Sequence, residues 1–117
     1  MNETAATALY VLAFTFLENA RPEQASVLLE ALDAVEPGQS RTLLALATAQ
    51  LRQGQAGEAL RTIERLSREG YCDAPLHLLR SQALRALGRH AQAHAAMTSY
   101  LLLRSSPPST QTRAQAA

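Results

Sequence analysis

Two histidines, His90 and His94, stand four residues apart, a spacing that places both imidazoles on one face of a helix. Such a pair could contribute to a zinc site. A zinc site needs three or four ligands, and this sequence has neither a Glu between the two histidines nor an evident third ligand. We therefore interpret the pair as part of a solvated helix face, and we predict no metal and no cofactor.

Cys72, followed by Asp73 and then by His77, is the arrangement closest to a catalytic nucleophile, because a histidine can accept the proton of a thiol and so form the reactive thiolate. No nearby residue would orient the histidine or stabilise an oxyanion, so a cysteine in a turn before a helix is the better interpretation. The glycines at 54 and 57 lack the pattern of a phosphate-binding loop, and no strand precedes them. We predict that the protein is not an enzyme.

Composition and charge limit the classes of partner and compartment. Eleven Lys and Arg against ten Asp and Glu give a net charge of +1, too small for many phosphate contacts, so we expect no nucleic-acid partner. The single cysteine cannot form an internal disulfide, which favours a cytoplasmic protein. The apolar segment 5–17 is shorter than the roughly 20 residues of a membrane span, and it follows Glu3 where a signal sequence would carry a basic residue.

Glycine and alanine recur in this chain with a fixed period. Gly54 and Gly88 are 34 residues apart, as are Ala59 and Ala93, and one further step back reaches Ala25. This period is that of the tetratricopeptide repeat, a pair of antiparallel helices with large and small residues at set positions. The sequence therefore predicts an all-α protein of three tetratricopeptide repeats, with six antiparallel helices stacked as an α-solenoid.

The three repeats are expected at 6–39, 40–73 and 74–107. The second departs from the pattern at Gln50 and Tyr71, and the third has His77 and Arg80 where the earlier repeats have leucine. We interpret the third repeat as a cap, because a terminal repeat faces solvent on one side. The small residues expected at close helix contacts are Ala13, Ala25, Ala47, Ala59, Ser81 and Ala93.

Local signals place the six helices and the domain boundary. The helices are expected near 3–19, 22–35, 39–53, 56–69, 73–87 and 90–104. Gly54 and Gly88 suit a left-handed residue after a helix, and Asp73 can cap the fifth helix. The segment 105–117 is polar and contains two prolines, so we predict a repeat domain at 1–104 followed by a flexible, disordered tail.

The first helix of each repeat lines the concave side of such a solenoid, where polypeptides bind. Tyr10, Leu44 and Leu78 recur at one position of that helix, where packing between helices needs no large residue. We expect an apolar groove with a basic rim that binds an amphipathic helix or an extended apolar segment. The predicted partner-binding residues are Tyr10, Phe14, Leu17, Arg41, Leu44, Leu51, Arg52, Leu78 and Arg85.

Other interpretations of these residues stay open. The apolar side chains could belong to the core, or the groove could be covered by the tail or by a second copy, which would make the unbound protein a homodimer. A groove that is filled permanently would indicate a general tetratricopeptide scaffold, a subunit of a stable complex.

Two stretches resemble a known family, the small tetratricopeptide chaperones of bacterial type III secretion systems. They are EQASVLLEALDAVEPG at 23–38 and RALGRHAQAHAAMTSYLLL at 85–103, and they are most similar to the SctY (YscY-like) type. The resemblance implies a chaperone that keeps a small secreted SctX-like protein soluble in its groove and delivers it to the cytoplasmic domain of the export gate. Chaperones of the needle subunit or of a translocator are similar in fold and are alternatives, although a translocator chaperone is usually longer.

Overall fold

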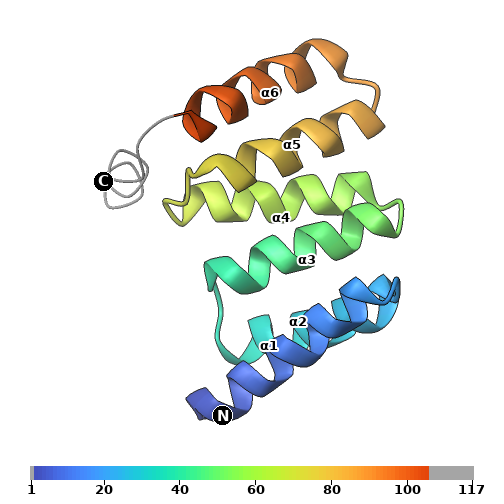
Figure 1. Cartoon of the computed structure of the whole chain (residues 1–117), viewed down its shortest axis with the longest axis vertical. Coiled ribbons are helices and arrows are strands. Elements are labelled where there is room, and N and C mark those ends of the chain that lie inside the picture. Colours follow the sequence, from blue (N-terminus) through green and yellow to red (C-terminus); the bar gives the residue numbers. More distant parts are fainter. Residues whose placement is uncertain (1, 106–117) are drawn as a thin grey trace.

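The computed structural model describes residues 2–105, and this part of the chain forms six α-helices without any strand. The helices are α1 (Glu3–Glu18), α2 (Pro22–Val35), α3 (Ser40–Arg52), α4 (Ala56–Arg68), α5 (Ala74–Ala86) and α6 (His90–Arg104). They are stacked in chain order, so that α1 and α6 lie at opposite ends (Figure 1). The predicted all-α solenoid of three helix pairs is confirmed, and each helix begins and ends within one residue of its predicted bounds.

The described part of the chain ends just after α6, where Ser105 is the C-terminal cap. Apart from Ser105, the predicted tail at 105–117 lies outside the described residues. Between residues 2 and 105, none of the helices has both the length and the apolar character that a membrane span requires.

Small residues that recur with the period of the repeat are buried between the helices. Ala13, Ala47 and Ser81, one on the first helix of each repeat, are fully buried. Ala25 and Ala59 on the second helices are also fully buried, and Ala93 is nearly so. A larger side chain at any of these points would overpack the contact, which explains why small residues recur with the period of the repeat.

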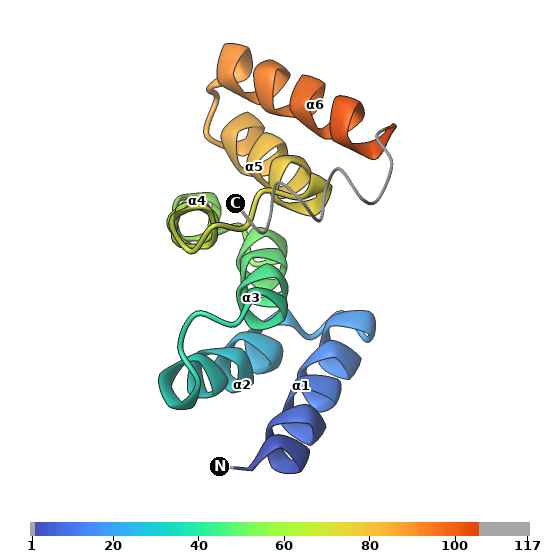
Figure 2. The same ribbon diagram turned by 90° about the vertical axis from the view of Figure 1, so that its left-hand side faces the viewer.

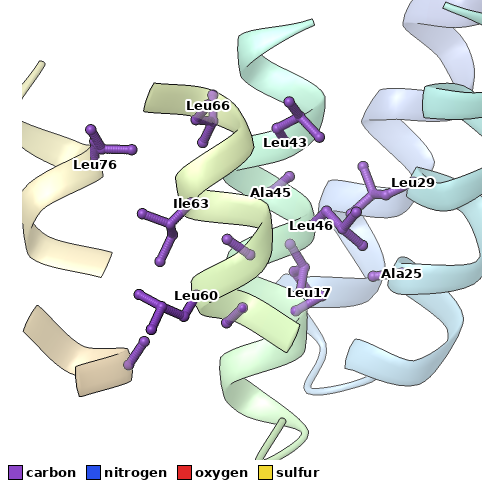
Figure 3. Close-up of a cluster of buried hydrophobic side chains, with 14 of the residues drawn as sticks. Leu17, Ala25, Leu29, Leu43, Ala45, Leu46, Leu60, Ile63, Leu66 and Leu76 are labelled. Carbon is purple, nitrogen blue, oxygen red and sulfur yellow. The ribbon is translucent and has the colours of Figure 1, made fainter. Parts of the chain in front are cut away.

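The core is a continuous set of aliphatic side chains between the helices. Leu17 of α1, Leu29 of α2 and Leu46 of α3 lie side by side, and Leu60 and Ile63 follow on α4 (Figure 3). Each repeat therefore buries its apolar face against the next one, as a solenoid requires.

Four turns contain a glycine in the left-handed conformation. Gly54 and Gly88, which end the first helices of the second and third repeats, both have φ of 78°, as predicted from the sequence. In the first repeat the same place is taken by Ala20, whose φ is 59°. An L-residue with a Cβ atom is strained in this conformation.

Gln50, a polar residue that departs from the repeat pattern, is hydrogen-bonded inside the fold. Gln50 is buried, and its side-chain oxygen accepts a 2.7 Å hydrogen bond from the hydroxyl of Thr62 on α4. The polar residue therefore costs little in the core, because its acceptor is paired.

The N-terminus of α5 is not capped by a side chain, in contrast to the prediction for the fifth helix. Asp73 does stand at the N-cap position of α5, but its side chain makes no capping hydrogen bond, and its buried Oδ1 has no partner among the described residues. The prediction of a side-chain cap was wrong there. In the same stretch Tyr71 replaces the proline of the repeat pattern, and it packs against the core.

Candidate functional site

The first helices of the three repeats surround one hollow of about 340 Å³, which we call the concave groove. The helices α1, α3 and α5 all contribute to it, whereas α2 and α4 lie on the other side of α3 (Figure 2). The lining residues are Tyr10, Phe14, Leu17, Glu18, Leu44, Ala45, Thr48, Arg52, Pro75, Leu78 and Leu79.

Tyr10, Leu44 and Leu78, the residues that recur with the repeat, all line the concave groove. Each is half-buried, so part of each side chain remains accessible to a partner. They are separated by one repeat length in the sequence, and the stacking of parallel first helices brings them around one space. The periodic residues therefore form one surface.

Aromatic residues of α1 form one wall of the groove. The rings of Tyr10 and Phe14 are stacked with their centroids 6.4 Å apart, and Phe14 is 47% exposed. The guanidinium carbon of Arg41 lies 4.8 Å from the centroid of the Tyr10 ring, a cation–π contact. Arg41 itself does not line the groove, and instead holds the Tyr10 ring from one side.

Leu17 and Arg52 have structural roles in addition to their place in the groove. Leu17 is only 4% exposed and belongs to the core, so it forms the floor of the groove. Arg52 Nη1 donates a 2.8 Å hydrogen bond to the carbonyl oxygen of Leu17. This oxygen is near the C-terminus of α1, where carbonyls lack helical partners, so Arg52 joins the first repeat to the second.

Three of the predicted partner-binding residues, Arg41, Leu51 and Arg85, lie outside the concave groove. Leu51 is half-buried and packs against the core, and Arg85 is exposed but does not line the hollow. Five lining residues are absent from the predicted partner-binding set: Glu18, Ala45, Thr48, Pro75 and Leu79. For Leu79 the sequence held a signal, because it directly follows the predicted groove residue Leu78.

The residues with catalytic or metal-binding potential remain apart from the groove. His90 and His94 are exposed on α6, and the described residues contain no group of three or more side chains suited to a metal ion. The His77 ring is next to Arg80, with Nδ1 and Nη1 3.5 Å apart. Burial lowers the pKa of His77, and the charge of Arg80 lowers it further, so the ring is a poor base for Cys72.

Comparison with known protein families identifies the class. The model of the tetratricopeptide-repeat family matches residues 16–83, which is more than half of the chain. The chain therefore belongs to the tetratricopeptide-repeat family. Among curated proteins, no sequence matches it.

Two solved structures have closely similar folds. One is PcrH in complex with the chaperone-binding region of PopB, with a TM-score of 0.85 and 19% identity over 99% of this chain and 96% of that one. The other is the type III secretion translocator chaperone SycD of Yersinia enterocolitica, with a TM-score of 0.83 and 21% identity over 98% of this chain and 89% of that one. At these identities the likeness establishes the fold, a three-repeat solenoid of the same extent.

Proposed function

We propose that this protein is a chaperone of a type III secretion system that binds an apolar segment of an exported protein in its concave groove. The observation that carries the proposal is the position of Tyr10, Leu44 and Leu78 around one accessible hollow. The similar solenoids of PcrH, which binds the chaperone-binding region of PopB, and of the chaperone SycD support it.

The groove offers enough apolar surface for a specific complex. Five large side chains, those of Tyr10, Phe14, Leu44, Leu78 and Leu79, are at least partly accessible within it. Burying the accessible half of each contributes about 1 kcal/mol, or on the order of 5 kcal/mol in total before ordering costs. Leu17 adds nothing to this sum because the fold already buries it.

The client that we propose first is a small secreted protein of the SctX type. This choice rests on the resemblance of residues 23–38 and 85–103 to the SctY type. In that role the chaperone would work in the cytoplasm and deliver its client to the cytoplasmic domain of the export gate.

A translocator is the second candidate client, and a specific observation favours it. PcrH was solved with the chaperone-binding region of PopB, and SycD is a translocator chaperone. The similarity of fold extends over 96% of the solved PcrH chain. A needle subunit is a further client of the same class.

Purification of the tagged protein from its own cells, followed by mass spectrometry, tests the proposal. A chaperone should emerge with one small, apolar, export-destined protein, and the identity of this protein decides between the client classes. Recovery of a larger assembly of constant composition would instead indicate a scaffold subunit. Without its client, the chaperone should be poorly soluble or self-associated, because the groove is then bare.

A further inference from the structure

A second hollow, of about 440 Å³, lies between α4, α5 and α6, and we call it the basic pocket. It shares no lining residue with the concave groove, because α5 presents different sides to the two spaces. The helix α5 lies between α4 and α6 in Figure 2. The lining residues are Leu60, Glu64, His77, Arg80, Leu84, Arg89, Gln92, Ala95, Ala96 and Ser99.

The charge of the basic pocket is not balanced within the fold. Arg80 and Arg89 supply its positive charge, and Glu64 is its single carboxylate. The ion pairs among residues 2–105 are those of Arg61 with Glu58 and of Arg65 with Asp33, so neither Arg80 nor Arg89 is in one. The side chain of Arg80 is half-buried, and its recorded side-chain contact is with His77 rather than with an acid.

The repeat pattern indicates that this polarity costs stability. His77 and Arg80 occupy the positions of Leu43 and Leu46 in the second repeat, where the leucines are 0% and 4% exposed. A half-buried cation without an acidic partner loses part of its hydration, which costs stability. The charged residues are therefore better explained by a ligand than by the fold, since residues that break a local rule cluster at functional sites.

We propose that the basic pocket binds an acidic amphipathic segment of a protein partner, at a site separate from the concave groove. An Asp or Glu side chain of this segment would accept hydrogen bonds from Arg80 and Arg89. An adjacent apolar side chain would pack on Ala95, which lines the pocket and is exposed on α6. A volume of about 440 Å³ holds more than one side chain.

The charge of the pocket selects this occupant over the protein's own tail. Residues 106–117 contain Arg113 and neither Asp nor Glu. They therefore offer no acidic side chain to the two arginines. We therefore assign the acidic segment to another polypeptide.

The test uses the full chain, labelled with ¹⁵N and titrated with a synthetic peptide built from leucine and glutamate. The expected result is shifted amide signals at the lining residues of α4, α5 and α6, without shifts in α1. The same peptide with lysine in place of glutamate should not bind. Arg80→Leu, which restores the leucine of the repeat, should weaken the acidic peptide about tenfold or more. The same substitution should leave the fold intact, with a free energy of unfolding that is unchanged or higher.

Two controls make the outcome decisive. Arg68→Leu removes an exposed positive charge from α4 outside the basic pocket, so it should change the affinity by less than about twofold. Phe14→Asp alters the concave groove and should leave binding of the acidic peptide unchanged. Equal affinity of Arg80→Leu and the native protein, or shifts confined to α1 and α3, would overturn the proposal. The proposal would also be overturned if the native protein self-associated, did not bind the peptide, and lost its self-association on Arg80→Leu. That result would assign the pocket to a second copy.

Discussion

Ala20 is the residue whose backbone is most at odds with its side chain. It has a φ of 59° at the place where the next two repeats have Gly54 and Gly88. A residue with a Cβ atom is destabilised by about 1–2 kcal/mol in the left-handed conformation. Glycine avoids this cost, but it loses more conformational entropy on folding, which offsets part of the gain. We expect Ala20→Gly to raise the free energy of unfolding by about 1 kcal/mol in urea denaturation.

A glycine in a helix provides the control for this prediction. Ala31 is exposed within α2. Ala31→Gly should lower the stability by about 1 kcal/mol, because glycine is a poor helix former. If both variants lost stability, Ala20 would not be strained.

Ser81 is a buried polar residue on α5. Its side chain is 0% exposed, and its Oγ makes no hydrogen bond among the described residues. The equivalent residues of the other repeats are alanines, Ala13 and Ala47. Ser81→Ala should therefore leave stability unchanged or raise it by about 1 kcal/mol, as measured by thermal unfolding. A loss of more than about 1 kcal/mol would mean that the hydroxyl is paired.

At the scale of helices, one ion pair connects the second helices of two repeats. Arg65 of α4 donates two hydrogen bonds, of 2.6 Å and 3.0 Å, to the carboxylate of Asp33 on α2. The Gly38 amide donates a third, of 3.2 Å. The hydrogen bonds from Arg65 lower the pKa of Asp33 and outweigh burial, which raises it.

This ion pair predicts how stability depends on pH. Because the pKa of Asp33 is lower in the folded state, the pair contributes its full stability above pH 3.8, the ordinary value, and loses it as the pH falls further. We expect Asp33→Asn to cost about 1 kcal/mol at pH 7 and to remove this part of the acid sensitivity in denaturation measured from pH 7 to 2.

The second ion pair is the matched control. Glu58 and Arg61 are more than half exposed within α4. Glu58→Gln should change the stability at pH 7 by less than about 0.5 kcal/mol. Equal effects of the two substitutions would contradict the special role of the pair between α2 and α4.

The helices were predictable because their limits depend on local chemistry. Gly54 and Gly88 adopt the left-handed conformation that ends a helix. The period of the small residues indicates which faces of the helices pack together. The path of the groove was less predictable, since it depends on how the helices cross. It runs from Tyr10–Glu18 in the C-terminal half of α1 to Pro75–Leu79 in the N-terminal half of α5. The position of a residue within the repeat does not reveal that the groove runs obliquely across the helices. This oblique path leaves Arg85 outside the groove.

At the scale of the whole molecule, three helix pairs generate two separate hollows, which we propose as binding surfaces. The concave groove arises from apolar residues that recur in every repeat, and such a signal is visible in one sequence. The basic pocket arises where His77 and Arg80 interrupt the pattern. The sequence showed this interruption and suggested a solvated cap, because nothing in it places α4 and α6 around the same side chains.

Photo-crosslinking in the protein's own cells tests the central claim that the concave groove holds a polypeptide. A benzophenone amino acid replaces Phe14, which is 47% exposed in the groove, or Val27, which is 66% exposed on α2 outside it. The account predicts a single adduct with one small protein from position 14 and none from position 27, with unchanged helicity by circular dichroism. No adduct at 14, or equal adducts from both positions, would contradict it.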